Sequence, residues 1–169
     1  MKRVALILLA ASCAFAGDPG RTSDWRPATA IELKTVIPAR APVEKERVET
    51  ELRTASGITD KNGKFIAGVL LITAGYSADG KYSHFFLTQV PLKIGDFSLK
   101  SGDYVFGFRK NENSMTVKFY DAQSGAPIGS VEATRLSHVG RIESIHIFPP
   151  GEKAVVQIGR FGFPYELTD

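Results

Sequence analysis

Residues 104–122 read YVFGFRKNENSMTVKFYDA, and this stretch decides the fold. Two runs of aromatic and β-branched residues flank a polar turn at 111–113, a pattern typical of an antiparallel β-hairpin. Because successive side chains of a strand point to opposite faces, the apolar residues of both runs share one face: Tyr104, Phe106, Phe108, Val117 and Phe119. The other face has Val105, Gly107, Arg109, Thr116, Lys118 and Tyr120, and we expect it to be more polar and in contact with water.

Similar runs extend in both directions from this hairpin. Turn-forming residues interrupt the chain at intervals of about 8 to 12 residues, most clearly at Asp79-Gly80, which is a strong hairpin signal. The strands expected between these turns are 47–59, 65–76, 81–90, 92–99, 104–110, 115–122, 128–135, 140–148 and 154–161. The spacing predicts an all-β domain over residues 47–169, an antiparallel β-sandwich of about 8–9 strands in a meander, with a small β-barrel as the alternative.

The first of these strands fits two interpretations. Val48 and Leu52 are four residues apart, as on one face of a helix, and the composition of residues 43–54 favours a helix. The same two side chains also alternate with charged neighbours, as in a strand. The turn signal at 60–63, which precedes another apolar run, favours the strand.

The N-terminus has the features of a secretory signal peptide. A short basic region, Lys2 and Arg3, precedes an apolar run at 4–11. Ala14 and Ala16 then fit the small-residue cleavage rule, with cleavage expected before Gly17. We therefore expect residues 1–16 to be removed and the protein to be exported, either to the periplasm or out of the cell.

Cys13 allows a second interpretation of the same segment. The sequence before it resembles the lipobox of bacterial lipoproteins, in which the cysteine is acylated, but here Leu9 stands four places before the cysteine rather than three. Under this alternative the protein would be lipid-anchored and would meet the membrane through Cys13. Otherwise Cys13, the only cysteine, belongs to the removed peptide and the mature chain has no disulfide.

Residues 17–46 differ in composition from the rest. Proline recurs in this segment, and the residue before each proline is restricted to extended conformations. We expect an extended or partly disordered Pro-rich leader, in which 31–37 can add an edge strand. Trp25, the only tryptophan, can hold this leader against the domain.

The charge argues against a nucleic-acid partner. The full chain has a formal charge of +3, and removal of Lys2 and Arg3 with the signal peptide lowers it to +1. A nearly neutral chain with interspersed charges has no electrostatic footprint for nucleic acid. No apolar run reaches the length of about 20 residues that a transmembrane helix needs, and no cofactor motif is present.

Several short motifs resemble those of an uncharacterised family of exported bacterial β-sandwich proteins. The likeness covers about residues 60 to 165 and rests on a hairpin pattern and two shorter pieces: Ile94, Gly95, Leu99, Gly102 and Tyr104; Phe119-Tyr120-Asp121-Ala122; and Pro149-Pro150-Gly151-Glu152-Lys153. It implies a fold and an exported location. It implies no catalytic residue and no activity.

The histidines give no catalytic or metal motif. His84, His138 and His146 lack the spacing of zinc ligands, and His146 alternates with apolar neighbours as on a half-buried strand, so we expect structural histidines. The sequence has no G-x-S-x-G nucleophile motif. A hydrolase would need at least two of these histidines to meet an acid in one cleft.

Aromatic residues offer the one candidate ligand surface. Phe163 and Tyr165 alternate near the C-terminus and, together with Tyr82 or Tyr120, can form a stacking surface for a glycan or peptide; the alternative is that they close one end of the core, which is the usual place of aromatic residues. We therefore expect an exported, non-enzymatic module that binds an envelope protein or glycan, or has a structural role there. The alternatives are a lipocalin-like carrier of a small apolar ligand, and a hydrolase with an unrecognised site.

Overall fold

The computed structural model describes residues 24–73 and 81–168, and its fold is all-β and antiparallel, as predicted. One helix, α2, spans Ala30–Val36. The strands are β1 (Arg26–Pro27), β2 (Arg40–Val43), β3 (Glu46–Thr59), β4 (Phe65–Leu71), β5 (His84–Thr88), β6 (Leu92–Ile94), β7 (Phe97–Leu99), β8 (Gly102–Lys110), β9 (Ser114–Asp121), β10 (Pro127–Arg135), β11 (Glu143–Ile147), β12 (Val155–Gly159), β13 (Phe161–Pro164) and β14 (Glu166–Leu167).

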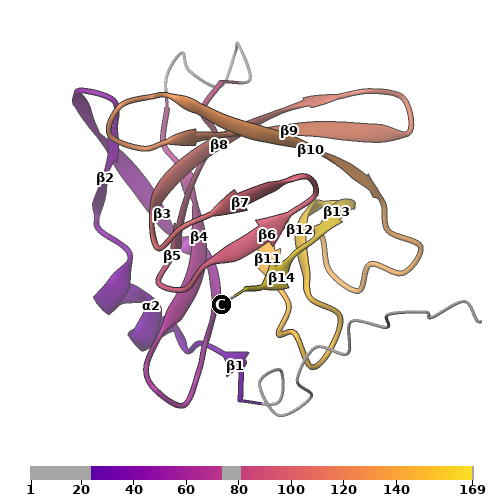
Figure 1. Ribbon diagram of the computed structural model, residues 1–169, viewed down its shortest axis with the longest axis horizontal. Coiled ribbons are helices and arrows are strands. Elements are labelled where there is room, and N and C mark those ends of the chain that lie inside the picture. The colour runs from indigo at the N-terminus through magenta and orange to yellow at the C-terminus, as the bar shows by residue number, and fades with distance from the viewer. Residues whose placement is uncertain (1–23, 74–80, 169) are drawn as a thin grey trace, which may run out of the picture.

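An 11-stranded sheet makes up most of the molecule. Its strands follow the order β1-β3-β4-β5-β8-β9-β10-β13-β12-β11, with β2 paired to β3, and β14, β6 and β7 form a small second sheet. The last strand of the path, β11, packs beside β3 and β4, so the sheet is nearly closed into a barrel (Figure 1). The main sheet is thus one continuous path rather than the two stacked sheets of a sandwich, and it comes nearer to the barrel alternative.

The predicted meander holds only in two parts, β3-β4-β5 and β8-β9-β10, because the run 92–99 lies in the small second sheet. After β10 the neighbouring strand is β13, and the order then runs backwards to β11. Two expected strands also break into hairpins, because Gly95 and Gly159 adopt positive φ angles of 55° and 59° that favour glycine. The run 92–99 becomes β6 and β7, and the run 154–161 becomes β12 followed by the first residue of β13.

Aromatic side chains fill the interior of the nearly closed sheet. The predicted core face of the hairpin is confirmed, since Tyr104, Phe106, Val117 and Phe119 are buried there and Phe108 packs against them. Phe119 lies at the centre of the aromatic contacts, with ring centroids 5.0 Å from Phe106, 5.7 Å from Phe86 and 5.9 Å from Phe163. Each such pair adds about 1 kcal/mol beyond the burial of its area.

A second apolar cluster lies on the outside of β4, β5 and β8. The segment from α2 to β2 covers it, with Leu33, Ile37, Ala41 and Val43 packed against the sheet (Figure 1). Val105 is therefore fully buried, and the expectation that the whole outer face of the hairpin is wet is wrong at this position. The outer face is polar only farther along, where Arg109 and Lys118 are exposed.

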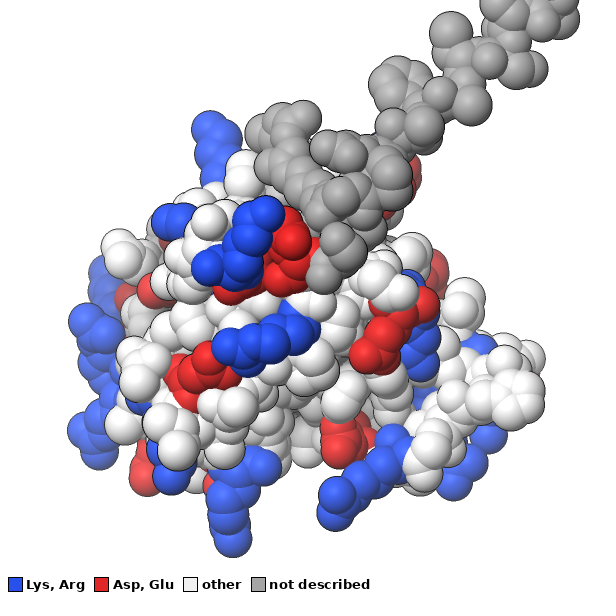
Figure 2. Space-filling view, turned by 90° about the horizontal axis from the view of Figure 1, so that it is seen from below, with Lys and Arg blue, Asp and Glu red and all other residues white. Residues whose placement is uncertain are grey.

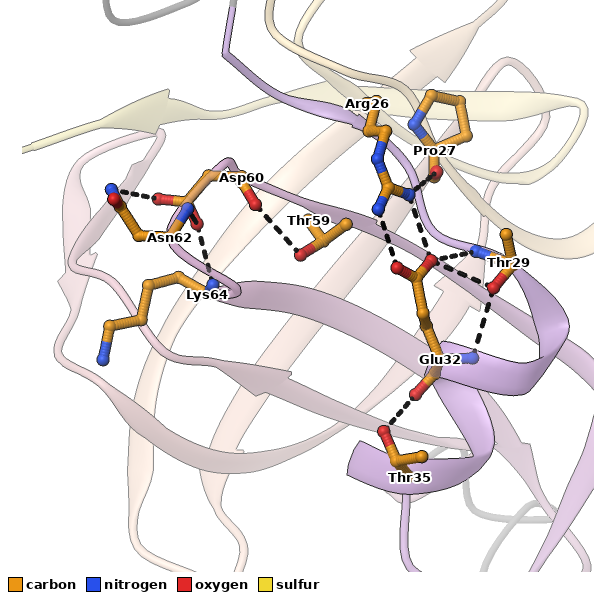
Figure 3. A network of polar contacts seen from close by, with 9 residues as sticks. All are labelled: Arg26, Pro27, Thr29, Glu32, Thr35, Thr59, Asp60, Asn62 and Lys64. Carbon is orange, nitrogen blue, oxygen red and sulfur yellow. Dashed lines mark hydrogen bonds and ion pairs between the residues drawn. The ribbon is translucent and has the colours of Figure 1, made fainter.

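A capping box explains why residues 30–36 form a helix rather than the edge strand expected at 31–37. The Thr29 hydroxyl accepts from the Glu32 backbone N–H at 3.3 Å, and the Glu32 carboxylate accepts from the Thr29 backbone N–H at 2.8 Å (Figure 3). Arg26 adds hydrogen bonds to the same carboxylate at 2.7 and 3.0 Å. These hydrogen bonds, those from Arg26 above all, hold the pKa of Glu32 at about 2.

Surface charge is mixed on the face drawn in Figure 2, where lysine and arginine side chains alternate with aspartate and glutamate. In the described ranges 24–73 and 81–168, no helix has the length and apolar character needed to cross a membrane.

Replacing Thr29 by alanine tests the cap. We expect Thr29→Ala to lower the free energy of unfolding by about 1 kcal/mol, because the helix loses its first side-chain hydrogen bond. Urea denaturation measures the change. Thr35→Ala is the matched control, since Thr35 lies inside the same helix and donates only to the Glu32 carbonyl at 2.6 Å; an equal loss in both variants would contradict the role of the cap.

Gly68 in β4 tests the closure of the sheet. A Cβ atom at position 68 would lie 2.4 Å from the Ile145 Cδ1 atom of β11. We expect Gly68→Ala to destabilise the protein by about 1–3 kcal/mol through overpacking, and Ile145→Val, which removes that methyl group, to recover part of the loss in the double variant. Thermal unfolding of both single variants and the double variant measures the coupling; strictly additive losses would show that the two strands do not touch in solution.

Candidate functional site

The structure separates the aromatic residues that the sequence proposed as a ligand surface. Phe163 and Tyr165 are buried in the interior cluster, where the Tyr165 hydroxyl donates to the Phe148 carbonyl at 2.6 Å. Tyr82 is fully buried on the outer side, and Tyr120, half-buried, meets it edge-on at 5.4 Å. The four side chains thus belong to two sides of the sheet. The proposed cleavage residues Ala14, Ala16 and Gly17 and the alternative acylation site Cys13 lie outside the described residues.

His84 is a buried residue of β5 and is 2% exposed. Its Nε2 lies 3.1 Å from the Ser144 carbonyl of β11. Because a carbonyl only accepts, Nε2 bears the proton, and Nδ1 of the neutral ring accepts from the Ser83 hydroxyl at 2.9 Å. The ring also stacks on Phe106 with centroids 4.8 Å apart. Burial lowers the pKa of His84 to about 4, so the ring is neutral near pH 7 and links β5 to β11.

The outer face of β8 and β9 contains a hollow of about 410 Å³. The register pairs Gly107 with Lys118 and Arg109 with Thr116, and places Tyr120 opposite the buried Val105. Since glycine has no side chain, the space opposite Lys118 stays open between Arg109 and Tyr120. We call this hollow the Tyr120 surface; its lining includes Lys81, Gly107, Arg109, Asn111, Thr116, Lys118 and Tyr120.

The Tyr120 surface is positively charged. Among the described residues, no acidic side chain forms an ion pair with Arg109 or Lys118. The Lys81 ammonium group donates to Glu44 at 2.9 Å, and the Tyr82 hydroxyl donates to the same carboxylate. These two hydrogen bonds, first that of Tyr82, lower the pKa of Glu44. Within the described ranges, the surface therefore has two cations without an acidic partner next to a half-buried aromatic ring; one carboxylate, that of Glu132 in β10, reaches its edge by accepting from the Thr116 hydroxyl.

A second, smaller hollow of about 220 Å³ lies beside β11. We call it the His146 pocket; its lining includes His138, Arg141, Glu143, His146, Lys153 and Gln157. Two of the three histidines therefore meet an acid in one hollow, which is the condition that the sequence set for a hydrolase. Glu143 Oε2 lies 2.6 Å from Nδ1 of His146, but in the described part of the chain no hydroxyl or thiol contacts Nε2 to act as a nucleophile.

Metal binding has no support in either hollow. Within residues 24–73 and 81–168, no group of three or more histidine, cysteine, aspartate or glutamate side chains could hold an ion together.

Sequence reasoning missed the charged residues of both hollows. Arg109 and Lys118 had been assigned to the wet face of the hairpin, and one further step, the register of the hairpin, would have placed them beside Tyr120. Arg141, Glu143, Lys153 and Gln157 all belong to the hairpin of β11 and β12: Arg141 precedes β11, Glu143 begins it, Lys153 lies in the connecting turn and Gln157 in β12. Alternation within a single strand does not give the register of this hairpin, which is irregular between Glu143 and His146.

No protein-family model, curated protein or solved structure matches this chain. The likeness to exported β-sandwich proteins therefore stays a prediction.

His84 predicts a specific dependence of stability on pH. The unfolded imidazole takes up a proton near its ordinary pKa of about 6.5, whereas the folded one does so only near 4. The contribution of neutral His84 is thus fully present above pH 6.5 and is lost as the pH falls toward 4, to a limit of about 3 kcal/mol. Urea denaturation from pH 7 to pH 4 measures the free energy of unfolding.

His84→Gln isolates this contribution, because the glutamine amide can still donate to the Ser144 carbonyl but does not titrate. We expect the variant to lose less stability than the wild type between pH 7 and pH 4. His138→Gln, at an exposed position, serves as the control and keeps the wild-type slope. The same slope in all three proteins would contradict the role of His84.

Proposed function

We propose that this protein is an exported, non-enzymatic binding module that binds an acidic glycan at the Tyr120 surface. One observation supports this most directly: Arg109 and Lys118 lie unpaired, among the described residues, beside Tyr120 in one hollow on the outer face of β8 and β9. Export rests on the signal-peptide pattern of residues 1–17, and the lipid anchor on Cys13 is its alternative.

The side chains of this surface match the chemistry of a sugar acid. The flat ring of Tyr120 offers an apolar face to the C–H groups of a sugar, and its edge-on contact with Tyr82 at 5.4 Å holds the ring in place. The guanidinium group of Arg109 can pair with a carboxylate through two hydrogen bonds. Asn111 and Thr116 line the same hollow; the Asn111 amide can form hydrogen bonds with sugar hydroxyls, whereas the Thr116 hydroxyl donates to Glu132.

The size of the hollow also fits a small saccharide. Its volume of about 410 Å³ lies within the range of about 300–1,000 Å³ that is usual for small-ligand sites. A neutral glycan would leave both cations without a partner, whereas a carboxylate on the sugar would pair with them. We therefore favour an acidic glycan over a neutral glycan.

The packing of the interior argues against the alternative of a lipocalin-like carrier. A carrier needs an apolar cavity within the barrel, but here Phe86, Phe106, Phe119 and Phe163 are fully buried against one another. A ligand on the outer face of the sheet therefore fits this protein better than a ligand inside the barrel.

Binding of oligogalacturonate tests the proposal, with uncharged dextran oligosaccharides of similar length as the comparison. We expect oligogalacturonate to bind by isothermal titration calorimetry and the neutral oligosaccharide not to bind. Arg109→Gln combined with Lys118→Gln should weaken binding by about tenfold or more, because the carboxylates lose their charge-assisted hydrogen bonds. Tyr120→Ala should weaken it as well, through loss of stacking.

Lys93→Gln combined with Lys100→Gln is the matched control. It removes the same number of charges at exposed positions outside the Tyr120 surface. If both double variants weakened oligogalacturonate binding equally, the loss would be an effect of net charge and not of the Tyr120 surface. Undiminished binding by Arg109→Gln with Lys118→Gln, in a protein whose circular dichroism is unchanged, would refute the proposed site.

A further inference from the structure

Gln157 of β12 is a buried polar residue of the His146 pocket and is 3% exposed. Its side-chain nitrogen donates to the Arg141 carbonyl at 3.0 Å and to the Gly159 carbonyl at 2.9 Å. Because both partners are carbonyls and can only accept, the orientation of the amide is fixed. The amide oxygen is then the only side-chain atom left to bind a ligand. That oxygen accepts no hydrogen bond from the described residues, yet it is not sealed from solvent. The pocket thus offers a preoriented acceptor.

His146 supplies a second oriented group. Its Nδ1 donates to Glu143, which leaves Nε2 as the ring nitrogen without a protein partner among the described residues. The same imidazole lies 4.3 Å from the Phe148 ring, and this contact and the Glu143 hydrogen bond together restrict its rotation. Nε2 is therefore a second polar atom of fixed direction in the pocket.

Two cations complete the pocket. Lys153 Nζ lies 3.5 Å from the centroid of the Phe148 ring, which places the ammonium group at the edge of the hollow. Arg141, whose backbone holds Gln157, also lines it. Within the described ranges neither cation has an acidic partner, and the single carboxylate of the pocket, Glu143, is engaged by His146.

We infer that the His146 pocket binds a small hydroxycarboxylate. Cations favour a carboxylate, and the free acceptor on Gln157 favours a ligand that also donates from a hydroxyl group. The volume of about 220 Å³ is below the range of about 300–1,000 Å³ that is usual for small-ligand sites, which favours a small acid or the end of a chain. The ligand is either a free acid or the terminal sugar acid of a longer chain.

Lactate and propionate form a matched pair of probes, because they differ only in the hydroxyl group. We expect lactate to shift the amide resonances of Gly140, His146 and Lys153 in titrations followed by two-dimensional NMR. Propionate should bind about tenfold more weakly, because it leaves the buried acceptor on Gln157 unpaired. Equal affinity for the two acids, or no shift at these residues with either of them, would overturn the inference.

Variants of the cations separate this pocket from the Tyr120 surface. Arg141→Gln and Lys153→Gln should each weaken lactate binding several-fold, whereas Lys118→Gln should leave it unchanged. Unchanged lactate binding in both pocket variants, with the fold intact, would overturn the inference even if oligogalacturonate binds as proposed at Tyr120. The two proposals therefore fail independently.

Oligogalacturonate distinguishes the two sources of the ligand. If only lactate shifts the amide resonances of the His146 pocket, the ligand is a free acid. If oligogalacturonate shifts them as well, the ligand is the end of a chain. Both outcomes support a hydroxycarboxylate. Shifts with lactate that spread over all exposed lysines and arginines, and that sodium chloride reproduces, would contradict a specific site.

Discussion

The packing of Ile145 in β11 over Gly68 in β4 brings the two ends of the sheet together. Because Gly68 has no side chain, the Ile145 Cδ1 atom can lie only 2.4 Å from the place where a Cβ atom would stand. Two hydrogen bonds accompany this contact, from the Ile147 N–H to the Ser56 hydroxyl at 2.9 Å and from His84 to the Ser144 carbonyl. They satisfy polar groups that a full strand ladder would otherwise have paired. The position of β11 in turn fixes the His146 pocket, since Glu143 and His146 project from that strand.

The N-terminal segment has a complementary role on the opposite side of the same strands. The inner faces of β4, β5 and β8 pack on the aromatic interior, and their outer faces carry Ala67, Val69, Phe85 and Val105, which α2 and β2 cover. Strands buried on both faces are apolar at successive positions rather than at alternate ones, and β5 shows this, with all five of its residues buried. The sheet is thus buried on both sides near β5, whereas its outer face is exposed to water farther along β8 and β9, where the Tyr120 surface lies.

The sequence predicted well what depends on neighbouring residues. Alternation in the hairpin of β8 and β9 gave the correct inner face, and the strong turn at 60–63 correctly favoured strand for β3. Three features were missed for separate physical reasons. The capping box at Thr29 and Glu32 overrides the extended preference that the prolines impose, turn glycines divide two runs into hairpins, and the order β13-β12-β11 depends on contacts between distant segments. Each hollow instead lies on one hairpin and depends on the register of that hairpin, so Tyr120 was a candidate from the sequence whereas Arg109, Lys118 and Gln157 were not.

The hydrogen bond between Ser56 and Ile147 joins residues that are 91 positions apart, and this separation has a consequence for how the chain folds. A ribosome makes β3 long before β11, so the barrel cannot close while synthesis is in progress. Until then β3 and β4 present an open edge and an uncovered apolar face. Chains whose native contacts are mostly non-local fold slowly, on the scale of milliseconds to seconds. By this measure, a nascent chain with so many non-local contacts stays unfolded longer than a helical chain of the same length.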